Sequence, residues 1–138
     1  MLSELSKSPE PRSGEQKRSP LVLVADDHPD AREVTQRFLQ VEGFRTEEAA
    51  DGIDAVTKAV VYLPSVVVMD LAMPRLDGWQ AIRELKTDPR TAHIRIVALT
   101  ARVLVRDEEK ARSAGCDAFL RKPIDPADLV TTIRGLLP

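Results

Sequence analysis

Residues 66–74 read VVVMDLAMP: three valines and a methionine, then an aspartate, then a short segment that closes on proline. A continuous apolar run of this length is typical of a strand that is buried on both faces of a parallel sheet. The pattern therefore predicts a strand that ends in Asp70, followed by a loop from Leu71 to Asp77.

The same pattern of an apolar run followed by a polar residue occurs on both sides of this stretch. Residues 21–25 (LVLVA) lead into Asp26 and Asp27, and residues 94–99 lead into Thr100. Shorter or weaker strands are predicted at residues 44–49 and 118–120, the latter followed by Lys122. Apolar residues at helical spacing, with prolines at helix starts and glycines at helix ends, predict helices at 29–42, around 55–60, and at 78–86, 104–114 and 126–137.

Five strands that alternate with five helices predict an α/β fold, a single doubly wound parallel sheet with helices on both faces. A length of 138 residues suits one domain with one core. Residues 1–20 are rich in serine and proline and have too little apolar content to offset the entropy of ordering. We expect a disordered tail at 1–20 and one domain at 21–138.

Composition excludes several classes of protein. The formal net charge is −2, which gives no reason to expect direct binding to nucleic acid or to a membrane surface. Cys116 is the only cysteine, so no internal disulfide forms and a reducing compartment fits. No apolar run approaches the roughly 20 residues that a membrane span needs, and no secretory leader is visible. These features predict a cytoplasmic protein.

The polar residues at the predicted strand ends carry the chemistry. In an open α/β sheet, ligands bind beyond the carboxyl ends of the strands, where the strand order reverses. With a strand order of 2-1-3-4-5, the first and third strands flank that point. Five side chains would then converge on one pocket, although they are spread along the sequence: Asp26, Asp27, Asp70, Thr100 and Lys122.

Three carboxylates in one pocket repel one another unless a cation is present. Oxygen ligands favour Mg²⁺ or Mn²⁺ over zinc. A carboxylate can also act as a nucleophile and form an aspartyl phosphate. Phosphoryl transfer mainly requires neutralisation of charge on the phosphoryl oxygens, which a metal ion, Lys122 and the hydroxyl of Thr100 would supply.

At this point the sequence resembles the receiver domain of two-component response regulators, over residues 21–137. The matching pieces occur in family order: Asp26-Asp27, Asp70-Leu71-Ala72-Met73-Pro74 with Asp77-Gly78, Thr100-Ala101, and Lys122-Pro123. The resemblance implies the receiver, or flavodoxin-like, fold.

The resemblance also implies a role for each site residue. Asp70 would accept the phosphoryl group. Asp27 would ligate Mg²⁺ directly and Asp26 largely through water, with Asp70 and the backbone carbonyl of Ala72 as further ligands. Lys122 would contact the phosphoryl oxygens.

The signal would leave the pocket through a switch pair. By the resemblance, Thr100 moves toward the phosphoryl group and Phe119 swings inward. The affected surface would be the fourth helix, fifth strand and fifth helix, between about Leu104 and Leu137. The resemblance further implies a cis peptide bond between Lys122 and Pro123, an arrangement practically confined to proline.

The resemblance implies partners as well. A sensor histidine kinase or a histidine phosphotransfer protein would donate the phosphoryl group, and a downstream protein would bind the altered surface. The domain would carry out its own phosphotransfer and dephosphorylation without being an enzyme on a separate substrate. Because the sequence given ends at Pro138, soon after the last predicted helix, a stand-alone regulator is expected, with a receiver cut from a larger regulator as the alternative.

Other interpretations remain open at this stage. Asp26, Asp27 and Thr100 could be helix caps, and Phe119 a static core residue. His28, beside the acidic pair, is interpreted as an exposed loop residue. A phosphatase resembling haloacid dehalogenases would share the aspartate nucleophile, but it needs a second acid where Ala72 stands. A degenerate receiver that only binds proteins is the remaining alternative.

Overall fold

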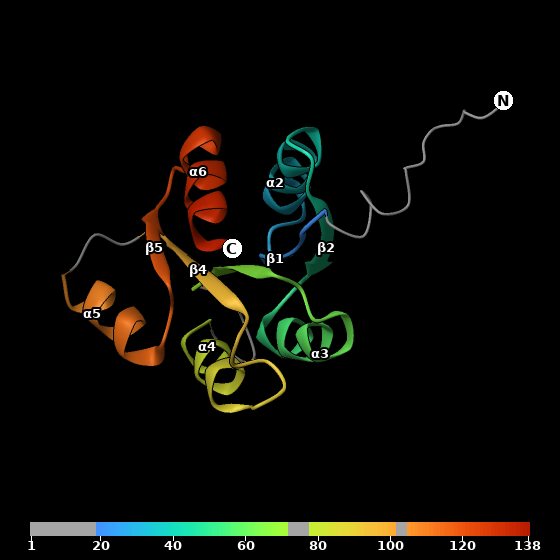
Figure 1. Ribbon diagram of the computed structural model, residues 1–138. Coiled ribbons are helices and arrows are strands. Elements are labelled where there is room, and N and C mark those ends of the chain that lie inside the picture. The colour runs from blue at the N-terminus through green and yellow to red at the C-terminus, as the bar shows by residue number, and fades with distance from the viewer. Residues whose placement is uncertain (1–18, 72–77, 102–104) are drawn as a thin grey trace, which may run out of the picture.

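The computed structural model describes residues 19–71, 78–101 and 105–138. Its centre is one five-stranded parallel sheet with the order β2-β1-β3-β4-β5 (Figure 1). The strands are β1 (Leu21–Ala25), β2 (Arg45–Ala49), β3 (Val66–Asp70), β4 (Arg95–Thr100) and β5 (Ala118–Arg121). The predicted fold class and strand order are therefore confirmed.

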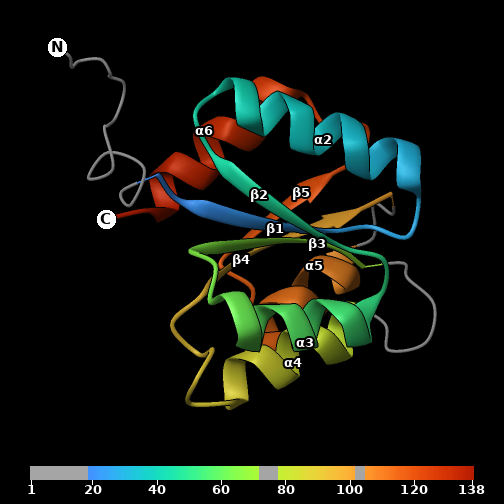
Figure 2. The same ribbon diagram turned by 90° about the vertical axis from the view of Figure 1, so that its right-hand side faces the viewer.

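Helices cover both faces of the sheet. They are α2 (Pro29–Val41), α3 (Gly52–Tyr62), α4 (Gly78–Thr87), α5 (Val105–Ala114) and α6 (Pro126–Leu136). Figure 2 shows α2 and α6 on one face, and α3, α4 and α5 on the other. Because the crossovers place helices on both faces, the central strands are shielded from water on both sides.

The valine-rich strands build two cores, one on each face of the sheet. Every residue of β3 is buried. Val67 and Met69 face the core beneath α3 and α4, whereas Val66 and Val68 face the core beneath α2 and α6. Burial of each such side chain stabilises the fold by about 1.5–3 kcal/mol. This alternation explains why an uninterrupted apolar run, rather than an alternating one, marks the strand.

Local signals fix where the helices begin and end. The carboxylate of Asp51 accepts a hydrogen bond from the backbone N–H of Asp54 at the start of α3, and Asp125 caps α6 through the N–H of Ala127. Gly43 follows α2 with a φ of 98°, a conformation that favours glycine. The cap at Asp125 starts α6 at Pro126, as predicted, whereas the cap at Asp51 starts α3 at Gly52, before the predicted stretch around 55–60.

The predicted strand bounds are off by one residue at some ends. Phe44 precedes β2 instead of beginning it, because its backbone N–H donates to the carbonyl of Leu39 near the end of α2. Likewise Ile94 precedes β4, with its backbone N–H bonded to Thr91. The predicted tail, 1–20, lies almost wholly outside the described residues. No helix in the described part of the chain is long and apolar enough to cross a membrane.

Candidate functional site

The carboxyl ends of β1 and β3 bring three carboxylates together. Asp26 and Asp27 directly follow β1, and Asp70 is the last residue of the neighbouring strand β3. One ligand atom from each lies within 4.8 Å of the others, and His28 completes the group. Asp26 and Asp70 are only 5% and 3% exposed, so their charges are poorly solvated. The sequence-predicted cluster of acids is therefore present.

Lys122 supplies the counter-charge from the other side of the site. Its Nζ lies 3.0 Å from Oδ2 of Asp70 and 3.6 Å from Oδ2 of Asp26. Burial acts to lower the pKa of the Lys122 ammonium, but the hydrogen bond and charge of Asp70, together with Asp26, outweigh burial and raise the pKa. Lys122 is therefore a cation fixed against the central carboxylate.

The acid cluster has a feature that suits a metal ion. Oδ1 of Asp27 is buried and accepts no hydrogen bond from the described residues, although Nδ1 of His28 lies 3.2 Å away. A buried carboxylate oxygen without a hydrogen bond is costly unless a cation neutralises it. Hard oxygen donors of this kind fit Mg²⁺. The donor set is therefore compatible with the predicted metal.

Thr100 and Phe119, the predicted switch residues, lie on the neighbouring strands β4 and β5. Thr100 ends β4 and is 5% exposed, and its carbonyl accepts a hydrogen bond of 2.7 Å from the N–H of Lys122. Phe119 is half-buried on β5 and packs against the core beneath α3 and α4. The Lys122–Pro123 peptide bond is cis, which confirms that prediction. The proposed carbonyl ligand, Ala72, lies outside the described residues.

Sequence reasoning missed the reason for a glycine at position 78. A Cβ built on Gly78 would lie 2.6 Å from Cα of Leu71 and 2.7 Å from the carbonyl oxygen of Asp70. Since both neighbours are backbone atoms, they cannot turn aside. Gly78 therefore lets the start of α4 pack directly against the end of β3, beside the central carboxylate. No local sequence signal reveals such an approach.

His28 occupies the N-cap position of α2, and its side chain is 70% exposed. Its backbone N–H donates to Oδ1 of Asp26 over 2.9 Å, and its Nδ1 lies 3.3 Å from the same oxygen. The interpretation of an exposed loop histidine is consistent with this position. The structure adds that its main chain helps to orient Asp26.

The fold and the site together define a class of protein. It is a doubly wound α/β domain whose acids cluster at the ends of β1 and β3 and face a lysine that follows β5. Residues 22–134 match the response regulator receiver domain family, and the chain belongs to this family. Members of the family are signalling domains of two-component systems and bind Mg²⁺ at the acidic pocket. The family match decides against the phosphatase alternative.

Relatives of known function are response regulators. The response regulator Rre1 of Synechocystis is 39% identical over 117 residues, which is 84% of this chain and 51% of that protein. The chain likewise spans about half of the Synechocystis regulator RpaA, at 49%. The polar-differentiation response regulator DivK of Brucella anthropi is 28% identical over 116 residues, 84% of this chain and 94% of that protein.

Solved structures agree in fold. The chemotaxis protein CheY4 of Vibrio cholerae superposes with a TM-score of 0.82 at 27% identity, covering 86% of this chain and 99% of CheY4. The receiver domain of the sensor histidine kinase PA1611 from Pseudomonas aeruginosa has a TM-score of 0.79 at 32% identity, over 86% and 97% of the two chains. That structure holds a magnesium ion coordinated in its active-site cleft.

Proposed function

We propose that this receiver domain accepts a phosphoryl group on Asp70, in the cytoplasm, from a sensor histidine kinase or a histidine phosphotransfer protein. The phosphorylated form then changes the surface that it offers to a downstream protein. The observation that carries the proposal is the position of Asp70, buried between a fixed lysine ammonium and two further carboxylates. An aspartate with only a structural role does not need two further carboxylates beside its lysine partner.

Asp26, Asp27 and Asp70 are the described residues that would hold Mg²⁺. When bound, the ion neutralises negative charge on the transferring phosphoryl oxygens. The oxygen of Asp27 that accepts no hydrogen bond from the described residues is available to it without loss of a hydrogen bond. The carbonyl of Ala72 remains a proposed ligand.

In the chemical step, a carboxylate oxygen of Asp70 attacks the phosphorus atom of a donor phosphohistidine. The new O–P bond forms as the P–N bond breaks, and the electron pair of that bond stays on the imidazole nitrogen of the donor. The ammonium group of Lys122 remains protonated and can shift from the carboxylate of Asp70 to a phosphoryl oxygen. There it would neutralise part of the negative charge of the phosphoryl group. The hydroxyl of Thr100 would donate a hydrogen bond to the same group.

A groove beside the site suits the approach of the donor. It runs between α2 and the segment that leads into α6, and one end is lined by Asp26 and Lys122. Its floor and walls are largely apolar: Val34, Phe38, Leu99, Ile124, Pro126 and Leu129. Val34 is 65% exposed there and would be covered by a bound partner. We propose that the donor protein docks along this groove.

The output would leave at the β5 edge of the sheet. Thr100 and Phe119 lie on the neighbouring strands β4 and β5, where Phe119 pairs with Ala98, two residues before Thr100. If Thr100 turns toward the phosphoryl group, the half-buried ring of Phe119 can enter the space that it leaves. Burial of an aromatic ring contributes about 1.5–3 kcal/mol, enough to shift a surface between two states. The proposed surface is α5, β5 and α6.

The test is Mg²⁺-dependent labelling by acetyl phosphate, followed by intact mass spectrometry. Wild-type protein should gain one phosphoryl group, and Asp70→Asn should keep the fold and gain none. Equal labelling of both proteins refutes Asp70 as acceptor. Absence of labelling in wild type, with a cognate donor also tested, supports the degenerate receiver instead.

A further inference from the structure

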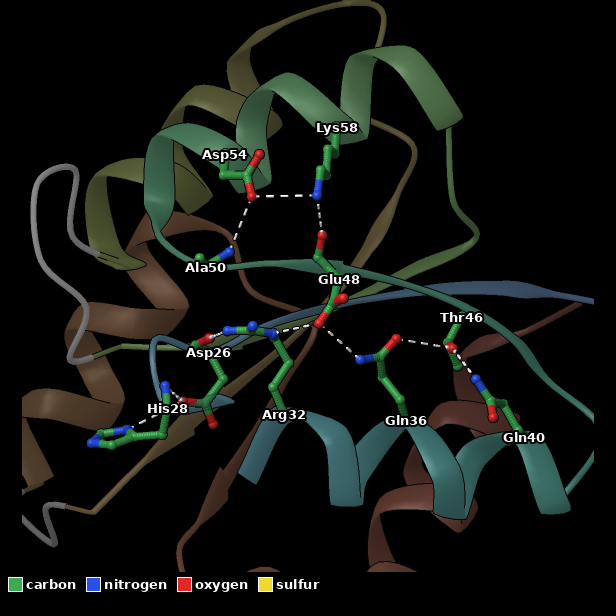
Figure 3. A network of polar contacts seen from close by, with 10 residues as sticks. All are labelled: Asp26, His28, Arg32, Gln36, Gln40, Thr46, Glu48, Ala50, Asp54 and Lys58. Carbon is green, nitrogen blue, oxygen red and sulfur yellow. Dashed lines mark hydrogen bonds and ion pairs between the residues drawn. The ribbon is translucent and has the colours of Figure 1, made fainter. Parts of the chain in front are cut away.

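Arg32 connects the second strand to the acid pair (Figure 3). It projects from the first turns of α2, and its side chain is only 15% exposed. Its Nε donates to Oε1 of Glu48 over 2.7 Å, and its Nη1 donates to the backbone carbonyl oxygen of Asp26 over 2.7 Å. One guanidinium therefore joins the carboxyl end of β2 to the residue that follows β1.

The backbone of Asp26 is held on both sides. Its N–H donates to the carbonyl of Ala49 over 3.1 Å, one step beyond the last β1–β2 pair, Ala25 with Ala49. Its carbonyl, which belongs to the peptide joining Asp26 to Asp27, accepts the hydrogen bond from Arg32. The peptide is planar and contains the Cα atoms of both Asp26 and Asp27. By holding the orientation of this plane, Arg32 constrains the direction of both acidic side chains.

Glu48 fixes the guanidinium in turn. Its Oε1 accepts from Arg32 and, over 3.2 Å, from Nε2 of Gln36 on the next turn of α2. On the other face of the sheet, Nζ of Lys58 donates to the backbone carbonyl of Glu48 over 2.6 Å. The end of β2 is thus tied to α2 and to α3, and Arg32 binds to a strand end that cannot easily move.

We infer that Arg32, anchored by Glu48, is a positioning residue that preorganises Asp26 and Asp27 for a divalent cation. This inference rests on the proposed function, because it concerns the same metal site. Arg32 makes no described hydrogen bond to the carboxylate oxygens of Asp26 or Asp27; it acts through the peptide that joins the two acids. Outer-sphere partners of this kind typically change metal affinity by about 10–100-fold when removed.

The direction in which Mg²⁺ affinity changes when Arg32 is replaced distinguishes a positioning role from a simple charge effect. Arg32 is a cation beside a site for a cation, so its charge opposes Mg²⁺ binding. Loss of the charge alone would make Mg²⁺ bind more tightly. If positioning dominates, loss of Arg32 makes Mg²⁺ bind more weakly.

The experiment is calorimetric titration of the full chain with MgCl₂. Arg32→Met removes both hydrogen bonds, and Arg32→Lys keeps the charge but lacks the planar two-nitrogen fork that makes both hydrogen bonds in a fixed geometry. Arg37→Met is the matched control, since Arg37 lies on the same helix, is 75% exposed and pairs only with Glu33 among the described residues. Circular dichroism and urea unfolding confirm that each variant is folded at the titration temperature.

We expect the dissociation constant of Arg32→Met to rise by about 10-fold or more. Arg32→Lys should show a smaller rise, and Arg37→Met an unchanged or slightly lower constant. Without Mg²⁺, the amides of Asp27 and His28 should exchange faster in Arg32→Met than in Arg37→Met. Wild-type affinity in both Arg32 variants overturns the inference while leaving the proposed function intact. If wild type itself binds no Mg²⁺, both are overturned.

Discussion

Nζ of Lys122 lies 3.0 Å from Oδ2 of Asp70, although Asp70 ends β3 and Lys122 follows β5, two strands that are not neighbours. Strand β4 lies between β3 and β5, so the lysine side chain reaches across the end of β4. The contact therefore joins the two halves of the site over the strand that carries Thr100. It also gives the buried Asp70 its cationic partner before any phosphoryl group arrives.

Removal of this ammonium should destabilise the metal-free protein. Lys122→Met leaves the carboxylate of Asp70 buried without its charged donor, and we expect the free energy of unfolding to fall by about 1–3 kcal/mol. Urea unfolding without Mg²⁺ measures this change. The double variant Lys122→Met/Asp70→Asn should recover most of the loss, because it removes the buried charge as well. Equal stability of Lys122→Met and wild type would contradict the prediction.

The metal site should depend on Asp27 more than on nearby acids. Asp27→Ala removes the buried oxygen that accepts no hydrogen bond, so Mg²⁺ affinity should fall by about 10-fold or more while the metal-free fold is not weakened. Asp30→Ala, which removes an exposed acid three residues away, is the control and should have little effect. Calorimetry and thermal unfolding measure both quantities. A Mg²⁺ affinity in Asp27→Ala equal to that of Asp30→Ala would place the metal elsewhere.

The two glycines at positions 78 and 135 should respond oppositely to alanine. Gly78→Ala forces a methyl group to within 2.6 Å of the backbone at Leu71, so we expect a loss of about 1–3 kcal/mol. Gly135→Ala lies in α6 with nothing within 4 Å of the added Cβ, and it should be neutral or gain up to about 1 kcal/mol. Urea unfolding compares them. Similar effects of the two changes would exclude backbone crowding as the cause.

The switch pair predicts a response beyond the pocket. Beryllofluoride, a mimic of the phosphoryl group, should shift backbone NMR signals across α5, β5 and α6. Thr100→Ala should still bind the mimic but show smaller shifts on that surface, since the hydroxyl that moves is gone. Asp70→Asn is the control and should show no response. Shifts confined to residues around Asp70, or a full response in Thr100→Ala, would rule out the switch.

Glu48 predicts a pH dependence of stability. The hydrogen bond from Arg32 is the main reason that the pKa of Glu48 lies below its usual value of 4.5. The unfolded chain therefore binds this proton more readily, and the stabilisation is present above pH 4.5 and lost as the pH falls through the lower folded pKa. Glu48→Gln should flatten the decrease of unfolding free energy below pH 4.5. An unchanged slope would show that Glu48 does not titrate as described.

Much of the fold could be predicted because its signals are local. An apolar run that ends in an acid locates β1 and β3, and the alternation of strands with helices then restricts the topology to a few parallel arrangements. The position of Asp70 followed from the same rule, since parallel strands end at the same edge of the sheet. Phe44 was misplaced because its backbone N–H bonds to the carbonyl of Leu39 near the end of α2, a contact that strand propensity does not reveal.

The contacts that refine the site could not be predicted in this way. Arg32 and Glu48 are 16 residues apart in different elements, and nothing in their local sequence links them. The crowding around Gly78 depends on how α4 returns to the end of β3. The ion pair of Lys86 with Asp117, 3.0 Å long, likewise joins α4 to the residue before β5. Such partners are determined by tertiary packing and become visible only with coordinates.

The arrangement of strand ends also makes the pocket depend on complete folding of the domain. The carboxylates come from β1 and β3, whereas the lysine that partners Asp70 follows β5, an edge of the sheet and the last of its five strands along the chain. A partly synthesised domain can contain all three acids and still lack the cation. The pocket is complete only once β5 has docked, so phosphorylation at Asp70 would be restricted to domains whose sheet is complete.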